Sequence, residues 1–130
     1  MKSGPKSRRV RLPICGMCEF PKRGEVYLVQ LPNQPHDGKE RPALVISLDI
    51  RNRLANDVIV VPITTNLRPA PTHVLLQEGE GGLRHNSIAK CEQVTTLDKS
   101  LLVRGPFGGR ISHEHLNDIE RGIMRAIGCI

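Results

Sequence analysis

Two short runs rich in aliphatic and β-branched residues, in the middle of the chain, constrain the fold most strongly. The first reads Pro-Ala-Leu-Val-Ile-Ser at 42–47, and the second reads Val-Ile-Val-Val-Pro-Ile at 58–63. Both runs are too short and too rich in β-branched residues to favour a helix, and both end in residues that suit a loop. The sequence therefore predicts two adjacent buried strands.

The outer ends of these two strands carry polar side chains, Arg41 before the first strand and Thr64 after the second. The connection at 49–56 has the composition of a turn or of a single helical turn. If this short connection makes the strands antiparallel neighbours, their outer ends meet at the same edge of the sheet. A guanidinium then lies near a hydroxyl, an arrangement that suits the binding of an oxyanion.

The rest of the chain predicts a mainly β fold with a C-terminal helix. Further strands are expected at 25–31, 73–77, 86–91 and 102–105, and 97–102 can form one helical turn. Pro62 is expected to mark an edge, a bulge or the end of its strand, because it cannot donate a ladder hydrogen bond. Ser112 is a suitable N-cap for a helix. That helix carries an apolar stripe at spacings of three and four, formed by Leu116, Ile119, Ile123, Met124 and Ile127.

Composition limits how the chain can bind nucleic acid. With no Trp, one Tyr and two Phe among 130 residues, a platform of rings for stacking bases is nearly ruled out, so any binding must use polar contacts. Residues 1–23 hold seven Lys and Arg and one Glu, and therefore carry the whole net charge of +6. We expect residues 1–20 to be a basic, mobile arm, either a tether for RNA or a solvated tail. Residues 21–130 form the folded domain, which must bind an anion through a local cluster.

The spacing of the four cysteines does not predict a metal or disulfide framework. Cys15 and Cys18 make a lone CxxC, while Cys91 and Cys129 stand far away. A structural zinc site usually needs four ligands, so reduced thiols in a cytoplasmic protein are favoured over a zinc shared by a dimer or a redox dithiol. We expect no metal and no other cofactor. We also expect no membrane span and no signal peptide, because no apolar run is long enough for a span and the basic N-terminus lacks an apolar h-region.

Four motifs, in order, resemble the MazF/PemK family of toxin–antitoxin endoribonucleases. They are 23–29 (Arg-Gly-Glu-Val-Tyr-Leu-Val), 41–47 together with Asn52 and Arg53, 60–65 (Val-Val-Pro-Ile-Thr-Thr), and 90–98 (Lys-Cys-Glu-Gln-Val-Thr-Thr-Leu-Asp). The resemblance covers about residues 22–128 and implies an SH3-like small β-barrel of the CcdB/MazF/PemK type. It also implies a homodimer, metal-independent cleavage of single-stranded RNA to 2′,3′-cyclic phosphate and 5′-hydroxyl ends, and a cognate antitoxin with an acidic, partly disordered tail.

The resemblance also suggests which residues carry the chemistry. Attack by a 2′-hydroxyl on its own phosphorus needs a proton acceptor, a donor for the leaving oxygen, and donors for the developing negative charge. Arg41 and Thr64 match the functional Arg and Thr of the family. Glu92 matches an acid that some members use, and His36 roughly matches a loop His. Candidates for RNA binding are Lys39, Thr65, Asn66, Lys90 and Gln93.

One segment departs from the family pattern. Residues 35–40 read Pro-His-Asp-Gly-Lys-Glu, in place of the Gly-Glu-Gln motif that usually precedes Arg-Pro in the family. The identity of the base and the preferred RNA sequence therefore stay open.

Two other functions fit parts of the sequence. A gyrase poison of the CcdB type shares the expected fold but works through aromatic residues at the end of its last helix. The corresponding residues here are Ala-Ile-Gly-Cys-Ile, which counts against this function. A non-catalytic nucleic-acid-binding regulator, or a degenerate toxin, would use the basic arm, with Arg41 only positioning phosphate.

Overall fold

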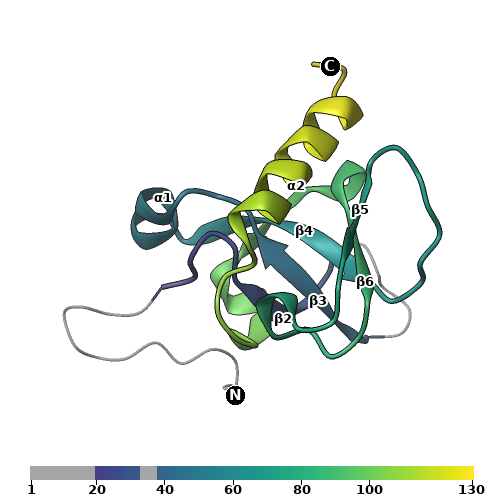
Figure 1. Cartoon of the computed structure of the whole chain (residues 1–130). Helices are drawn as coiled ribbons and strands as arrows, with labels where there is room; N and C mark the ends of the chain where they lie inside the picture. The colour runs from purple at the N-terminus through teal and green to yellow at the C-terminus, as the bar shows by residue number, and fades with distance from the viewer. Residues whose placement is uncertain (1–19, 33–37) are drawn as a thin grey trace.

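The computed structural model describes residues 20–32 and 38–130. Within these ranges, seven strands form one sheet in which paired strands run antiparallel, and the helix α2 (His113–Ala126) lies across it, as Figure 1 shows. Apart from Phe20, the arm predicted at 1–20 lies outside the described residues. Within the described ranges, no helix has both the length and the apolar character that crossing a bilayer requires.

The chain forms short strands that are connected by loops, helices and 3-10 turns. The strands are β2 (Val26–Gln30), β3 (Glu40–Val45), β4 (Asp57–Thr64), β5 (His73–Leu76), β6 (Ser87–Lys90), β7 (Thr95–Asp98) and β8 (Leu102–Arg104). The helix α1 (Asp49–Leu54) connects β3 to β4, and single 3-10 turns form η1 (Glu80–Gly82), η2 (Cys91–Gln93) and η3 (Lys99–Leu101). The order across the sheet is β5-β6-β4-β3-β2-β8, and β7 pairs with β4.

Strand β4 is the centre of this arrangement because it pairs with three other strands. On one side it pairs with β3, with Ala43 opposite Pro62. On the other side its residues 57–60 pair with β7, and residues 63–64 pair with β6. The expectation that Pro62 marks an edge, a bulge or a strand end is therefore wrong. Pro62 lies inside β4 where the strand changes partners, so its missing amide hydrogen removes little from the ladders.

The sheet buries apolar side chains on both faces, as expected for a strongly curved sheet. Leu116 and Ile119 of α2 pack on one face, in a cluster that includes Val26, Leu44 and Val61. The other face holds a second cluster, formed by Tyr27, Val29, Leu31, Ala43, Val45, Val58, Val60, Leu97 and Leu102. The alternation of side chains along β2, β3 and β4 feeds both clusters. The prediction of a mainly β fold with a C-terminal helix is confirmed.

Two details differ from the sequence-based expectations. Residues 95–98 form the strand β7, and the helical turn predicted at 97–102 is confined to η3. The predicted stripe of α2 is also too long, because Met124 and Ile127 are exposed. Leu116 and Ile119 are buried and Ile123 is partly buried. The C-terminal part of the helix extends past the sheet, as Figure 1 shows.

Gly122 lets α2 lie close to η2. A Cβ at this position would come within 2.7 Å of the Cys91 Sγ, and Cys91 is fully buried. Burial raises the pKa of the Cys91 thiol to about 12, so this sulfur is a neutral packing group.

We therefore expect Gly122→Ala to destabilise the protein. Overpacking costs about 1–3 kcal/mol, and the better helix propensity of Ala offsets only about 1 kcal/mol. Thermal unfolding should show a melting temperature lowered by several degrees. Adding Cys91→Ala to the variant should restore part of the loss, because it removes the sulfur that the new methyl group meets.

Gly109→Ala is the matched control, since a Cβ there has no atom within 4 Å. Equal melting temperatures for Gly122→Ala and wild type would show that close packing of α2 against Cys91 does not require a glycine at position 122.

Candidate active site

The register between β3 and β4 brings the two predicted polar ends together. Ala43 lies opposite Pro62 and Leu44 opposite Val61. Extended by two residues, this register places Arg41 opposite Thr64, so both side chains leave the same face of the sheet. Arg41 is half-buried and its Nε is a buried atom. The expectation that the outer ends of these strands meet at one sheet edge agrees with the observed register.

The Thr64 hydroxyl has a defined local role at the end of β4. Its Oγ1 accepts a hydrogen bond from the Asn66 amide at 3.1 Å. Because a hydroxyl can accept and donate at once, the Thr64 hydrogen can still be given to a ligand oxygen. Thr65 and Asn66, also predicted to bind substrate, are exposed just beyond the strand.

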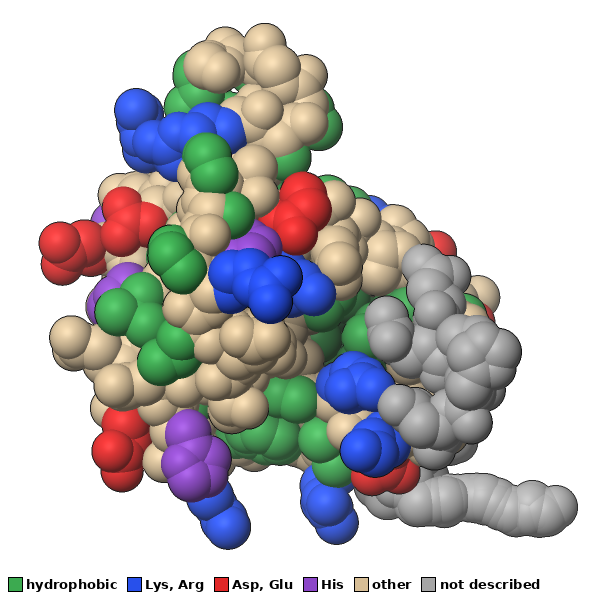
Figure 2. Space-filling view, turned by 90° about the vertical axis from the view of Figure 1, so that its right-hand side faces the viewer, with side chains coloured by type: hydrophobic (Ala, Val, Ile, Leu, Met, Phe, Trp, Pro, Cys, Tyr) green, Lys and Arg blue, Asp and Glu red, His purple; other side chains and the backbone are tan. Residues whose placement is uncertain are grey.

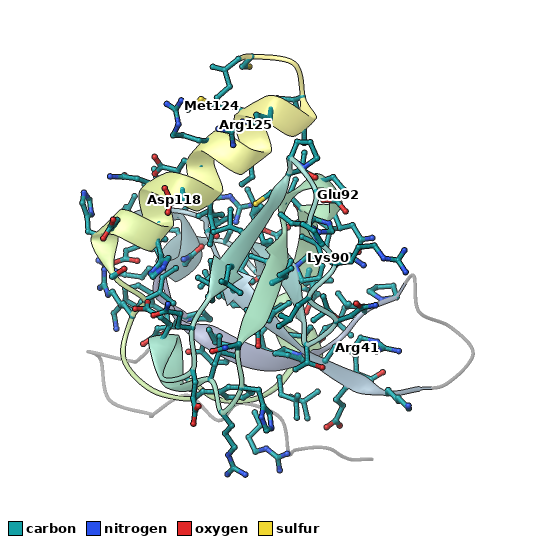
Figure 3. The ribbon with its side chains drawn as sticks, turned by 45° about the vertical axis from the view of Figure 1, so that its right-hand side comes forward. Arg41, Lys90, Glu92, Asp118, Met124 and Arg125 are labelled. Carbon is teal, nitrogen blue, oxygen red and sulfur yellow. The ribbon has the colours of Figure 1, made fainter. Side chains whose placement is uncertain are left out.

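Lys90 and His73 lie on the same face as Arg41 and Thr64. Thr64 is opposite Ile88 on β6, and Lys90 is two residues further along β6. Lys90 is in turn opposite His73 on β5. Figure 3 shows Glu92, Lys90 and Arg41 following one another along one side of the molecule. The sheet therefore presents a row of polar side chains beside the Arg41 position.

Glu92 is held by His73, the first residue of β5, and by Thr72, which directly precedes this strand. The Thr72 hydroxyl donates to Glu92 Oε1 at 2.7 Å, and His73 Nε2 lies 3.1 Å from Glu92 Oε2. His73 Nδ1 lies 2.8 Å from the carbonyl oxygen of Arg68. Both ring nitrogens thus face oxygen acceptors, so both contacts are hydrogen bonds only when the ring carries two protons.

These contacts set the charge of the Glu92 carboxylate. Partial burial alone raises the pKa of Glu92, but hydrogen bonds from Thr72, from the backbone amide of Glu92 and from His73 outweigh burial and lower that pKa below its usual range. Glu92 is therefore ionised at neutral pH. Sequence reasoning missed Thr72 and His73, because only the pairing of β5 with β6 brings them to Glu92.

A cavity of about 400 Å³ lies beside Glu92. Glu92 and Gln93 line it together with Pro62 of β4 and with Leu31 and Pro32, which follow β2. Pro32 is followed in the sequence by the segment that contains His36. His36 itself lies outside the described residues, and Lys39 is exposed just before β3. The structure thus places Gln93 next to Glu92 on one cavity wall.

Metal ligands do not gather in the described part of the chain, where no three His, Cys, Asp or Glu side chains are close enough to hold an ion. Cys91 is buried and Cys129 is exposed, and both are free thiols. Cys15 and Cys18, the lone CxxC, lie outside the described residues.

Solved structures with this architecture define the class of fold. MazF from Deinococcus radiodurans aligns with a TM-score of 0.71 at 19% identity, over 85% of this chain and 98% of that protein. An endoribonuclease in complex with its cognate antitoxin, from mycobacterial species, aligns with a TM-score of 0.71 at 28% identity, over 85% of this chain and 97% of that protein. The predicted CcdB/MazF-type barrel is confirmed.

Sequence comparison extends this result to the family. Endoribonuclease EndoA from Bacillus subtilis (strain 168) is 40% identical over 87 residues, which are 62% of this chain and 73% of EndoA. The model of the PemK-like, MazF-like toxins of type II toxin–antitoxin systems matches residues 22–127. The chain therefore belongs to this toxin family, as its motifs predict.

The surroundings of Glu92 lead to a prediction about its titration. Replacing Thr72 by Val and His73 by Leu keeps apolar volume but removes both side-chain donors. The effect of burial then dominates, so the pKa of Glu92 should rise. NMR titration of the Glu92 carboxyl carbon should show this change. In the wild type, the depressed pKa contributes stability above the ordinary carboxylate pKa, and this contribution is lost as the pH falls through the folded-state pKa.

Asp98 provides an internal control for the same titration. Hydrogen bonds from the backbone and side chain of Ser100 lower the pKa of Asp98, and the two substitutions do not touch them. A Glu92 pKa that stays unchanged in the double variant would show that neither donor controls it.

Proposed function

We propose that this protein is an endoribonuclease toxin that cleaves single-stranded mRNA by attack of a 2′-hydroxyl on the adjacent phosphorus, without a metal ion. The observation that carries the proposal is the polar face on which Arg41, Thr64 and Lys90 lie beside Glu92. Two relatives with related sequences are named as the endoribonucleases EndoA and MazF. An mRNA substrate places the activity in the cytoplasm.

Each group on this face has a chemical role in the proposed reaction. The Arg41 guanidinium is permanently charged and can bind two phosphate oxygens at once. The Thr64 hydroxyl donates to a non-bridging oxygen as negative charge develops. Lys90 attracts the phosphate backbone, while Thr65, Asn66, Lys39 and Gln93 contact the flanking RNA.

Proton transfer has two candidates. Glu92 is ionised and so is ready to accept a proton, although its lowered pKa makes it a weaker base than an ordinary carboxylate. His36 belongs to a residue type whose ordinary pKa suits proton transfer near neutral pH. The products of either route are a 2′,3′-cyclic phosphate and a 5′-hydroxyl.

A cognate antitoxin is the proposed partner that blocks this site. The mycobacterial endoribonuclease with a similar fold was solved with its own antitoxin bound. An acidic, partly disordered segment would complement the positive charges of Arg41 and Lys90 and would fold as it binds. RNA and antitoxin would then compete for one surface.

A homodimer is also part of the proposal. Strand β5 lies at the edge of the sheet and pairs only with β6 among the described strands. Leu75 on this strand is 50% exposed, and at the C-terminal end of α2 Met124 is 38% and Ile127 66% exposed. Figure 2 shows exposed hydrophobic side chains on the helix and on the sheet below it. Covering an open strand edge and an apolar helix end is a common reason for two copies to associate.

The central prediction concerns Arg41. Arg41→Ala should lower cleavage of a mixed-sequence RNA in EDTA by about 10²–10³-fold, since one donor to the developing charge is lost. The fold should be unchanged. Sequencing of the RNA ends and circular dichroism measure these two results.

The matched control is Arg53→Ala, which removes an exposed arginine from α1 on the side of the molecule away from β5 and β6. A 2′-deoxy residue at the cleaved position should block the reaction. The same assay on Glu92→Gln and His36→Gln identifies the proton acceptor, because the larger loss belongs to that residue. If the wild-type protein leaves the RNA intact, the proposed enzymatic activity is contradicted and a non-catalytic regulator is favoured.

The dimer leads to a separate prediction. Leu75→Lys places a charge on the β5 edge and should shift the protein from dimer to monomer in analytical ultracentrifugation. Leu54→Lys, at a 72% exposed position on α1, should not. A wild-type protein that stays monomeric at high concentration, or two variants that behave alike, would contradict this interface.

A further inference from the structure

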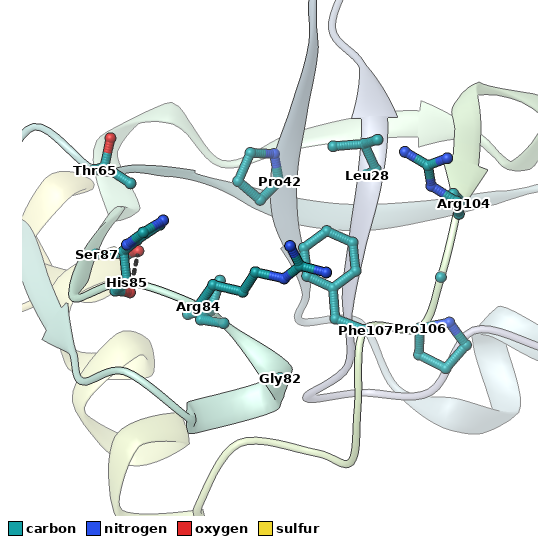
Figure 4. A pocket seen from close by; sticks show the side chains of 12 residues that line it. Leu28, Pro42, Thr65, Gly82, Arg84, His85, Ser87, Arg104, Pro106 and Phe107 are labelled. Carbon is teal, nitrogen blue, oxygen red and sulfur yellow. Dashed lines mark hydrogen bonds between the residues drawn. The ribbon is translucent and has the colours of Figure 1, made fainter.

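A second and larger cavity, of about 750 Å³, opens on the other face of β3. Pro42 lines it, whereas Arg41 points to the opposite face, because neighbouring residues in a strand alternate. Leu28 is paired with both Pro42 and Arg104, so one row of β2, β3 and β8 forms the floor. Figure 4 shows this floor with Phe107 beside it.

The rim of this cavity is basic. Arg84, His85 and Arg104 line it, all three are exposed, and no acidic residue contributes to the lining. Within residues 20–32 and 38–130, neither Arg84 nor Arg104 forms a hydrogen bond or an ion pair through its guanidinium. In Figure 4, Arg84 points across the cavity in the direction of Phe107.

Three other arginines of the domain are neutralised by acidic partners. Arg23 pairs with Glu120, Arg51 with Asp57, and Arg110 with Asp49. Because residues 24–130 are neutral overall, the charge on this cavity is a local excess rather than part of a general basic surface. The cavity therefore combines unneutralised positive charge with an apolar floor and one aromatic ring, features that complement a nucleotide.

This cavity meets the candidate active site at the end of β4. Thr65 lines the cavity, and the preceding residue, Thr64, faces the Arg41 side of the sheet. The Cα atoms of consecutive residues are about 3.8 Å apart. An RNA chain that places one phosphate at Arg41 and Thr64 can thus cross the strand end and reach the cavity with a neighbouring nucleotide.

We propose that this cavity is a binding subsite for one nucleotide of the RNA substrate, close to the cleaved bond. The inference rests on the proposed cleavage at Arg41 and Thr64. The base packs on Phe107 and the apolar floor, and the nucleotide's phosphate lies between Arg84 and Arg104. The volume suits such an occupant, since sites for small ligands measure about 300–1,000 Å³.

The same charges could attract an acidic segment of an antitoxin. RNA is the favoured occupant because the cavity joins the cleavage edge through Thr65, and because an apolar floor with an aromatic ring suits a base. The backbone of the rim is also fixed, since the buried Ser87 hydroxyl donates to the His85 carbonyl at 2.8 Å. A cavity with a fixed rim can discriminate between bases.

The test couples changes in the protein to changes in the RNA. Short RNAs with one cleavable bond carry an abasic nucleotide at each position near that bond in turn. For the wild-type protein, one abasic position should lower kcat/KM about tenfold, the usual effect of one lost stacking contact. Phe107→Ala should cause a similar loss with intact RNA. It should cause no further loss with that one abasic RNA, because the same contact is already absent.

Arg84→Gln should weaken binding of an RNA that carries a 2′-deoxy residue at the cleaved position, and binding should become less sensitive to salt. Arg53→Gln, at an exposed position on α1, is the matched control and should change neither measurement. Melting temperatures of all variants establish that the fold is retained.

The outcomes distinguish a failure of the proposed RNA cleavage from a failure of the proposed nucleotide subsite. A wild-type protein that cleaves none of these RNAs overturns the proposed function and this inference with it. Normal cleavage by wild type, with losses for Phe107→Ala that are equal for every abasic RNA, overturns the subsite alone. Variants that bind the antitoxin more weakly but bind and cleave RNA normally would assign the cavity to the antitoxin instead.

Discussion

The pairing of β4 with three other strands is the constraint on which the rest of the structure depends. Its register with β3 sets Arg41 opposite Thr64, and its pairing with β6 sets Lys90 on the same face. Its pairing with β7 closes the second apolar cluster around Val60 and Leu97. A slip of one residue would reverse every one of these side chains, so the two apolar clusters and the polar row are specified together.

The sequence was sufficient to predict those features that depend on local pattern. The aliphatic runs at 42–47 and 58–63 predict β3 and β4, and Ser112 predicts the start of α2. β7 was missed because its four residues include only one buried apolar side chain, Leu97. The α2 stripe was predicted too long because periodicity shows which residues share a face, but not where the supporting sheet ends.

The site was predictable in part, for the same physical reason. Motif resemblance selects Arg41, Thr64 and Glu92, and strand register then explains why the first two share an edge. The partners of Glu92 are His73, the first residue of β5, and the preceding Thr72, which lie nineteen and twenty positions away along the chain. No local sequence pattern indicates these contacts. The scarcity of aromatic residues argued against a stacking platform, yet a single ring, Phe107, is enough to furnish one position for a base.

The close contact between Gly122 and Cys91 links distant parts of the molecule mechanically. Cys91 directly precedes Glu92 in η2, and Gly122 lies in α2, whose far end carries the exposed Met124 and Ile127. Protein interiors are close-packed and therefore transmit strain between neighbouring elements. Any partner that tilts this helix must also move η2, and with it the carboxylate that His73 and Thr72 hold. The exposed end of the helix is thus coupled through Gly122 to the segment that carries the candidate active-site carboxylate.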